Sequence, residues 1–173
     1  MISRTRPNAR VVADVPIERV QTYAANGRLP KIGELVFTEH MRRRLFGEDH
    51  PDVASSLTHL AILQVETHKY REALESAVAA TELSTKAFSA THWRTAVAQS
   101  AQGAARAGLG DYAEAERLLT SSYTTLSGDL GALPTYRNRA RGYLEDLYRR
   151  WQRPMPAAQL ALLAAGAVHA EQR

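Results

Sequence analysis

Hydrophobic residues recur along the chain at the three- and four-residue spacing of helices that bury one side. Short polar turns separate these stretches, and several contain glycine or proline, such as Gly47, Gly110 and Pro134. The pattern predicts helices over about 16–27, 30–46, 51–67, 70–88, 93–107, 112–126, 134–151 and 157–170. The sequence therefore predicts an all-α protein built from helix–turn–helix pairs.

The helix pairs repeat with a fixed period, which is the distance along the chain from Tyr70 to Tyr112. The turn at 68–73 has the sequence HKYREA, and the turn at 110–115 has the sequence GDYAEA. The same offset separates other identical residues: Phe46 and Phe88, His50 and His92, Ala54 and Ala96, Glu72 and Glu114, and Ala73, Ala115 and Ala157. A fixed period of this length indicates a helical repeat solenoid, in which each pair buries its apolar side against the next pair.

The period divides the chain into a flexible N-terminal tail at 1–14 and a solenoid at 15–172. The solenoid should hold about three and a half to four repeats, because its first unit is shorter than the others. The expected units are roughly 15–46, 47–88, 89–130 and 131–172.

Small residues recur where helices of neighbouring pairs must approach closely, as at Ala61, Gly103 and Ala115. A solenoid also needs a terminal element that covers its last apolar side. The helix at 157–170 is expected to be this cap, with Leu160 and Leu163 facing inward and Gln159 facing solvent.

Composition narrows the class of protein. Hydrophobic residues make up 45% of the chain and charged residues 23%, as in ordinary globular proteins. The chain contains no cysteine, which excludes disulfides, thiolate metal sites and cysteine nucleophiles. The longest apolar run, Leu160–Val168, is about half of the roughly 20 residues needed to span a membrane. We therefore expect a soluble, cytoplasmic protein that does not contact the membrane.

The net charge of +4 comes partly from clustered arginines. Acidic residues such as Glu145 and Asp146 lie between these arginines, so solvated helix faces explain them better than a stripe that binds nucleic acid. The arginines concerned are Arg42, Arg43, Arg44, Arg137, Arg139, Arg141, Arg149, Arg150 and Arg153. We expect no nucleic-acid partner.

Histidines are the strongest candidates for chemistry, but their spacing favours structural roles. His50 and His92 are repeat-equivalent and lie in turns, where they can cap the next helix. His59 and Glu66 lie two turns apart on one helix and could face a common groove, yet no third group is evident that would orient them as an acid–base pair. No pair of histidines has metal-ligand spacing on one helix face. We expect no metal, no cofactor and no catalytic residue.

Three stretches resemble a known family. The stretch Leu45–Leu57, which contains GEDHP, is similar to the tetratricopeptide repeat of the kinesin light chain type, whose period equals the one found here. Gly110–Ala115 matches the Gly-x-Tyr-x-x-Ala turn of that repeat, and Leu144–Ala158 resembles the closing repeat of bacterial tetratricopeptide proteins. The resemblance implies a right-handed superhelix whose concave face binds peptides. Family members that bind peptides clamp the ligand backbone with asparagines, whereas the matching positions here include Thr58 and Ser100.

The resemblance places one face of two helices on the concave side. We expect its residues to contact a partner: Ser55, Thr58, His59, Ile62, Val97, Ser100, Ala101 and Ala104. This set is small and apolar, which favours an apolar helix or peptide anchor and a weak dependence of affinity on salt. The floor could instead be empty or filled by the N-terminal tail of the same chain. The predicted function is a non-catalytic protein–protein interaction or scaffold module; the alternatives are a regulatory sensor of a signalling peptide or small ligand, and an enzyme. Homo-oligomer formation stays open.

Overall fold

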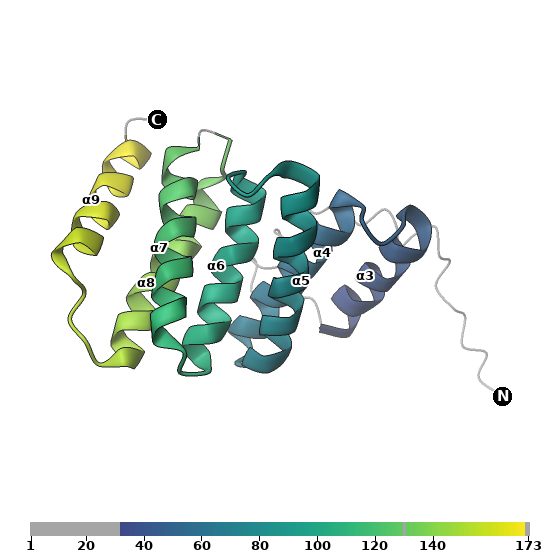
Figure 1. Ribbon diagram of the computed structural model, residues 1–173, viewed down its shortest axis with the longest axis horizontal. Coiled ribbons are helices and arrows are strands. Elements are labelled where there is room, and N and C mark those ends of the chain that lie inside the picture. The colour runs from purple at the N-terminus through teal and green to yellow at the C-terminus, as the bar shows by residue number, and fades with distance from the viewer. Residues whose placement is uncertain (1–31, 130, 172–173) are drawn as a thin grey trace.

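The computed structural model describes the backbone of residues 32–129 and 131–171, and the side chains of residues 39–129 and 131–165 (Figure 1). The predicted tail at 1–14 and the predicted helix at 16–27 lie outside these residues. Seven helices and no strand form the described part: α3 (Ile32–Phe46), α4 (Pro51–Glu66), α5 (Tyr70–Phe88), α6 (Trp93–Gly108), α7 (Tyr112–Gly128), α8 (Pro134–Trp151) and α9 (Ala157–Glu171). Each predicted helix within this range is confirmed to within two residues.

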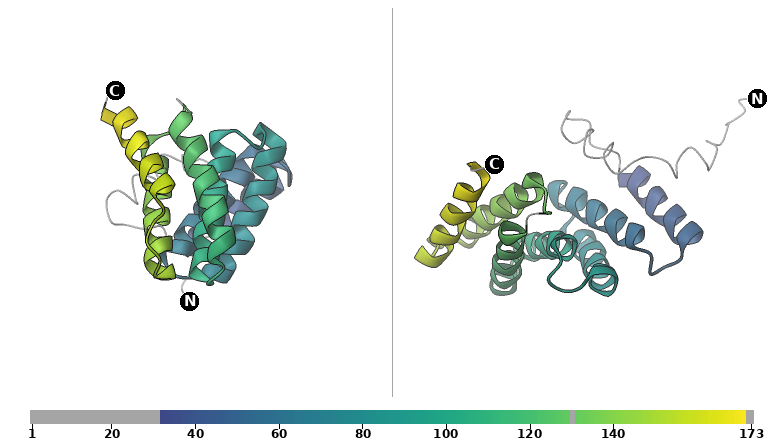
Figure 2. Two further views of the ribbon diagram at one scale, coloured as in Figure 1. Left: turned by 60° about the vertical axis from the view of Figure 1, so that its left-hand side comes forward. Right: turned by 90° about the horizontal axis from the view of Figure 1, so that it is seen from above.

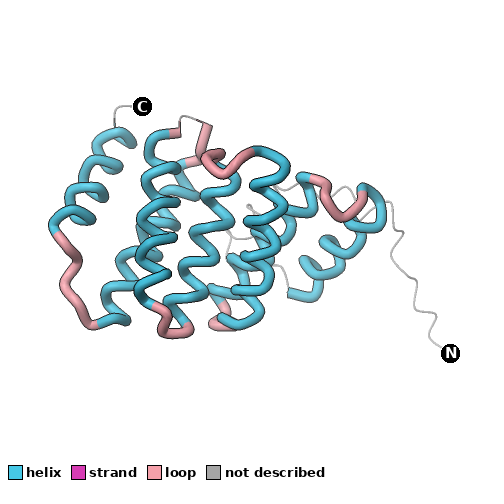
Figure 3. The backbone as a smooth tube through the Cα atoms, in the orientation of Figure 1, coloured by secondary structure: helices cyan, strands magenta, loops and turns pink. Residues whose placement is uncertain are grey.

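The helices are connected by short loops and pack in chain order into an all-α repeat solenoid (Figure 3). Consecutive helices from α3 to α8 contact each other, α6 also contacts α4 and α8, and α9 lies against α7. The helices therefore form two layers, with α4, α6 and α8 in one row and α5 and α7 in the other (Figure 2). The period sets this arrangement, because α6 and α7 begin one period after α4 and α5.

Histidine side chains cap the first helix of two repeats. The Nδ1 atom of His50 accepts a hydrogen bond from the backbone N–H of Asp52 at 3.2 Å, and Nδ1 of His92 accepts one from the N–H of Arg94 at 3.1 Å. Each bond satisfies an N–H group that the first turn of a helix leaves without a partner. The predicted capping role of both histidines is confirmed. The preceding acidic residue, Asp49, does not cap α4, because His50 occupies the N-cap position.

Each capping histidine also connects two repeats. The His50 ring stacks on Phe46 at the end of α3 with 4.8 Å between ring centres, and the His92 ring stacks on Phe88 at the end of α5 with 4.9 Å. The chain can turn at these two joints because one residue after the end of the helix adopts positive φ, as Gly47 does at 91° after α3.

Replacing His92 with alanine should lower the free energy of unfolding by about 1 kcal/mol, because the N-cap bond of α6 is lost. Asparagine has a smaller side chain that still accepts this hydrogen bond, so His92→Asn should recover most of that loss. Urea unfolding followed by circular dichroism would measure both values. Equal losses in the two variants would show that the ring stacking, and not the cap, carries the stability.

Asp111 precedes α7 but does not cap it with its side chain. Its carboxylate instead forms an ion pair with Arg106 on α6 at 2.6 Å. The backbone at this position, with φ of −82° and ψ of 68°, differs from the extended conformation of His50 and His92, and the carboxylate turns toward the arginine.

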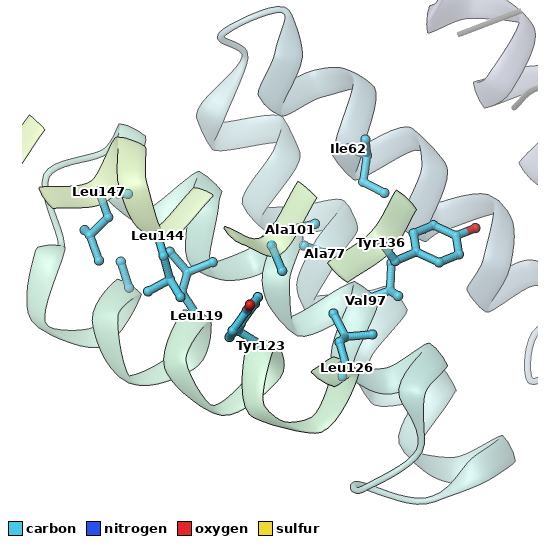
Figure 4. Packing of buried hydrophobic residues seen from close by; sticks show 14 of the residues in the cluster. Ile62, Ala77, Val97, Ala101, Leu119, Tyr123, Leu126, Tyr136, Leu144 and Leu147 are labelled. Atoms are coloured by element: carbon cyan, nitrogen blue, oxygen red, sulfur yellow. The ribbon is translucent and has the colours of Figure 1, made fainter. Parts of the chain in front are cut away.

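The main core extends along the layer of α4, α6 and α8 and into α7 (Figure 4). Small residues allow the close approach that the sequence predicted. A Cβ atom at Gly103 would lie 2.7 Å from Cγ of Leu119 and 3.3 Å from the carbonyl oxygen of Ala115. Glycine is thus required where α6 crosses α7.

The last helix has a different orientation from the predicted one. Leu163 is buried as expected, but Leu160 is 55% exposed. Gln159 faces inward and donates a hydrogen bond from Nε2 to Oε1 of Glu116 on α7 at 3.4 Å, and the same carboxylate oxygen accepts a bond from Tyr148 on α8. The expected orientation of Leu160 and Gln159 was wrong. The helix carries apolar residues on nearly every side, so its sequence does not define one inward side, and Gln159 contacts Glu116.

Candidate functional site

Two side-chain contacts connect α4 to α8 across the middle helix of the row. The hydroxyl of Tyr136 on α8 lies 3.5 Å from Nε2 of His59 on α4. Two turns further along α4, Oε1 of Glu66 lies 3.5 Å from Nη2 of Arg139 on α8. Since α6 lies between α4 and α8, these contacts pass over the side of α6 that faces away from α5 and α7. We call these four residues the bridging residues.

The structure places the eight predicted partner-binding residues on this row of helices, but mostly below its surface. Only Ser55 and His59 are half-buried; the other six are buried, namely Thr58, Ile62, Val97, Ser100, Ala101 and Ala104. Ile62, Val97 and Ala101 belong to the same core cluster as Tyr136, which lies beside them in Figure 4. Side chains of α4 and α8 thus cover the residues of α6 that were expected to form an open groove floor.

Three contributors from α8 were not among the predicted site residues: Tyr136, Arg139 and Tyr143. Two of these residues could have been predicted from the repeat period. Arg139 follows Val97 by one period, and Tyr143 follows Ala101 by the same interval. Extending the predicted positions by one more repeat would therefore have found both residues. Tyr136 is the equivalent of exposed Arg94, so the period gave no signal for it; its ring packs against Trp93, with 5.8 Å between ring centres.

His59 is held in one orientation as a neutral imidazole. Its Nδ1–H donates to the carbonyl oxygen of Ser55 at 2.7 Å, so Nε2 keeps a lone pair that faces the Tyr136 hydroxyl. Burial lowers the pKa of His59; the bond to the Ser55 carbonyl opposes this shift, and the positive charges of Arg139 and Arg42 add to it. The arrangement presents a hydrogen-bond acceptor that is influenced by the positive charges of two guanidinium groups.

Tyr143 contributes a buried hydroxyl that has no hydrogen-bond partner among the described residues. Burial raises the pKa of Tyr143, and among its neighbours Arg139 lowers this pKa while Glu66 raises it. Its ring packs against the cluster that contains Val65 and Ala104. A buried polar group without a partner is uncommon in a folded protein, and this hydroxyl keeps its capacity to donate and accept a hydrogen bond.

The chemistry of this face is hydrogen bonding and ion pairing. In the described part of the chain, no three histidine, aspartate or glutamate side chains come close enough to hold a metal ion. His59 is oriented by a backbone carbonyl rather than by a carboxylate, and its free nitrogen faces a tyrosine hydroxyl. These side chains can exchange their present partners for groups of a bound chain.

The stability of the protein should fall as the pH decreases below about 6.5, the ordinary histidine pKa. The folded state holds His59 with a lowered pKa, so the unfolded state binds more protons in this range and acid favours unfolding. The slope from this residue is at most about 1.4 kcal/mol per pH unit. Urea unfolding of His59→Gln between pH 7 and pH 5 should show a smaller slope than the unaltered protein; equal slopes would show that other groups cause the dependence.

Comparison with known proteins does not assign the chain to a family. No family model matches the sequence, and no curated protein matches it either. No helix within the described residues is both long and apolar enough to cross a membrane.

Proposed function

We propose that the protein is a non-catalytic interaction module that binds a peptide or helix of another protein on the face formed by α4, α6 and α8. The observation that carries this proposal is the pair of contacts from α4 to α8, His59–Tyr136 and Glu66–Arg139, which gather polar groups from two repeats on one face. A tetratricopeptide-type repeat, which the sequence resembles, would place its concave, peptide-binding side on the same row of helices. The cytoplasmic location expected from the sequence belongs to this proposal.

The chemistry of the bridging residues determines the kind of recognition. Each of them already has a partner within the chain, so a bound peptide gains hydrogen bonds only by replacing those partners. The side chains of Arg139 and Glu66 are 30% and 34% exposed, which lets a peptide reach the ion pair from solvent. We therefore propose a partner that offers both a donor and an acceptor, in place of the purely apolar anchor expected from the sequence.

This proposal predicts a measurable dependence of affinity on salt. Charged contacts at a partly exposed surface are screened by ions. Peptide affinity should therefore fall as the salt concentration rises from about 0.05 to about 0.5 M, by a few-fold per charged contact that is formed. An affinity that stays constant over this range would favour the apolar anchor and contradict exchange at the bridging residues.

A peptide library displayed on phage tests the proposal without a known partner. Peptides enriched on the unaltered protein are measured by fluorescence anisotropy against Arg139→Glu, which reverses one charge of the face. The control is Arg117→Glu on α7, where Arg117 also forms an ion pair with a glutamate, Glu114, but on the other layer. We expect at least a tenfold loss of affinity, about 1.4 kcal/mol, for Arg139→Glu and less than a twofold change for the control.

Two results would contradict the proposal. Either no peptide is enriched above background, or the enriched peptides bind Arg139→Glu as tightly as the control. The double variant Glu66→Arg, Arg139→Glu keeps an ion pair between α4 and α8 with the charges exchanged. Its melting temperature separates a loss of binding from a loss of folding.

A further inference from the structure

Three side-chain contacts join α8 to a repeat that is not its neighbour, and all of them pass over α6. Two are the contacts of the bridging residues, which connect α4 to α8. In the third, Nη2 of Arg150 on α8 donates a hydrogen bond to the hydroxyl of Tyr70 on α5 at 2.9 Å, and the guanidinium lies 5.4 Å from the centre of the Tyr70 ring. We call these three contacts the clasp.

The third contact lies on the same side of α6 as the other two. Glu66, Gly108 and Arg150 occupy the same position in successive repeats, so the face of α4 that carries Glu66 corresponds to the faces of α6 and α8 that carry the other two residues. The Tyr70 ring lies against Gly108 at the end of α6, because a Cβ atom there would come within 2.3 Å of the ring. The clasp therefore follows one side of α6 to its last residue.

The clasp covers apolar residues that would otherwise line an open groove. Three residues of α6 on this side have at most 7% of their surface exposed: Val97, Ala101 and Ala104. Rings from both sides belong to the same packed clusters as these residues, namely Tyr70 from α5, and Tyr136 and Tyr143 from α8. A peptide can reach this apolar surface only if α8 moves away from α4 and α5.

Contacts of this kind are not needed to build the solenoid. In repeat proteins each unit contacts its neighbours, and the stability is approximately a sum of unit and neighbour contributions. Both α4 and α8 pack on α6, so the architecture is complete without contacts that pass over this helix. Water also reaches the clasp, since Arg150 is exposed and Tyr70 is half-buried. Such contacts contribute little to stability and can break while the helices stay folded.

We propose that the clasp holds the peptide-binding face closed, so that α8 must separate from α4 and α5 before a peptide reaches α6. The closed form is favoured without a partner, because opening exposes the apolar residues of α6 to water. A peptide that covers these residues binds only the open form, and its apparent affinity is reduced by the fraction of molecules that are open. The effect on affinity rests on the function proposed above, because it requires a peptide that binds this face.

Removing one contact of the clasp should raise the affinity for a peptide. Tyr70→Phe keeps the ring and deletes the hydroxyl that contacts Arg150 and, within its own repeat, His68. The closed form then has one hydrogen bond fewer, so the open fraction and the affinity should increase by about three- to tenfold in fluorescence anisotropy with a library-selected peptide. The matched control is Tyr148→Phe, which deletes a tyrosine hydroxyl that contacts Glu116 between the adjacent helices α7 and α8. This control should change the affinity by less than about twofold.

Distances between spin labels test the clasp without any peptide. The chain has no cysteine of its own, so labels can be attached through Glu75→Cys on α5 and Asn138→Cys on α8, two exposed positions. We expect double electron–electron resonance to show one main distance in the labelled protein and in its Tyr148→Phe variant. An additional, longer distance should appear in the Tyr70→Phe variant, because part of its molecules are open.

The two measurements separate failure of the clasp from failure of the proposed function. If Tyr70→Phe shows the same distances as the control, or binds peptides no more tightly than the control, the proposal is wrong even though peptides bind. If the distances lengthen in Tyr70→Phe but no peptide is enriched, the clasp is confirmed and the proposed function is wrong. Arg150→Met removes the same contact from α8 and must reproduce the longer distance, which decides the matter even if Tyr70→Phe does not fold.

Discussion

Replacing Gly108 with alanine is expected to destabilise the protein by about 2 to 3 kcal/mol, the upper range for forcing extra volume into a packed site. Gly108 ends α6, and a Cβ atom there would lie only 2.3 Å from Cδ1 of the Tyr70 ring. The ring cannot move away freely, because its hydroxyl contacts Nδ1 of His68 at 2.6 Å and accepts a bond from Arg150 at 2.9 Å. The new methyl group must therefore displace Tyr70 or separate α6 from the preceding repeat.

Gly142 provides a control of opposite sign. It lies within α8, and a Cβ atom at this position would meet nothing within 4 Å. Gly142→Ala should stabilise the protein by up to about 1 kcal/mol, because alanine loses less conformational freedom in a helix than glycine does. Urea unfolding by circular dichroism measures both changes. If Gly108→Ala is stabilising as well, the contact between Gly108 and Tyr70 does not limit the spacing of the repeats.

Replacing Leu119 with alanine should cost about 3 kcal/mol or more, as for other leucines that leave a cavity in a core. Leu119 is fully buried on α7 and faces Gly103 on α6. Gly103→Ala alone should also destabilise, by about 1 to 3 kcal/mol, because its Cβ atom would approach Cγ of Leu119 to 2.7 Å. Both losses test the same contact between the two helices of one repeat.

The double variant Gly103→Ala, Leu119→Ala tests whether these residues are coupled. Removing the Leu119 side chain creates the space that a methyl group at position 103 needs, so the two losses should not add. We expect the double variant to be more stable than the sum predicts by at least about 1 kcal/mol. Simple additivity in urea unfolding would contradict the close packing of α6 on α7.

The period predicted the fold well because it depends on many residues at once. Every repeated turn and apolar stripe indicated the same pairs of helices, and local signals such as Gly47 and the His50 cap agreed with them. Small residues at helix crossings, such as Gly103, also follow from the need of neighbouring helices to approach each other. These features could be predicted because each is determined within one or two adjacent repeats.

The candidate site could be predicted only in part, because it depends on contacts between distant helices. The sequence identified the face of α4 that contains His59, but Tyr136 comes from a helix far along the chain and covers residues that were expected to be open. The burial of Arg137 was missed for a related reason, since charge was given more weight than its position in the period. The rotation of α9 could not be predicted, because its apolar residues do not define one inward side.

Site-specific photocrosslinking tests the central claim, that a peptide binds on the row of α4, α6 and α8. A photoreactive amino acid replaces either Ser55, one turn before His59 on α4, or Thr85 on α5 in the other layer. Both native side chains are small hydroxyls that bond to the backbone of their own helix, so the two substitutions remove the same kind of bond. With a library-selected peptide, the account predicts strong crosslinking from position 55 and little from position 85; equal crosslinking, or crosslinking from position 85 alone, would contradict it.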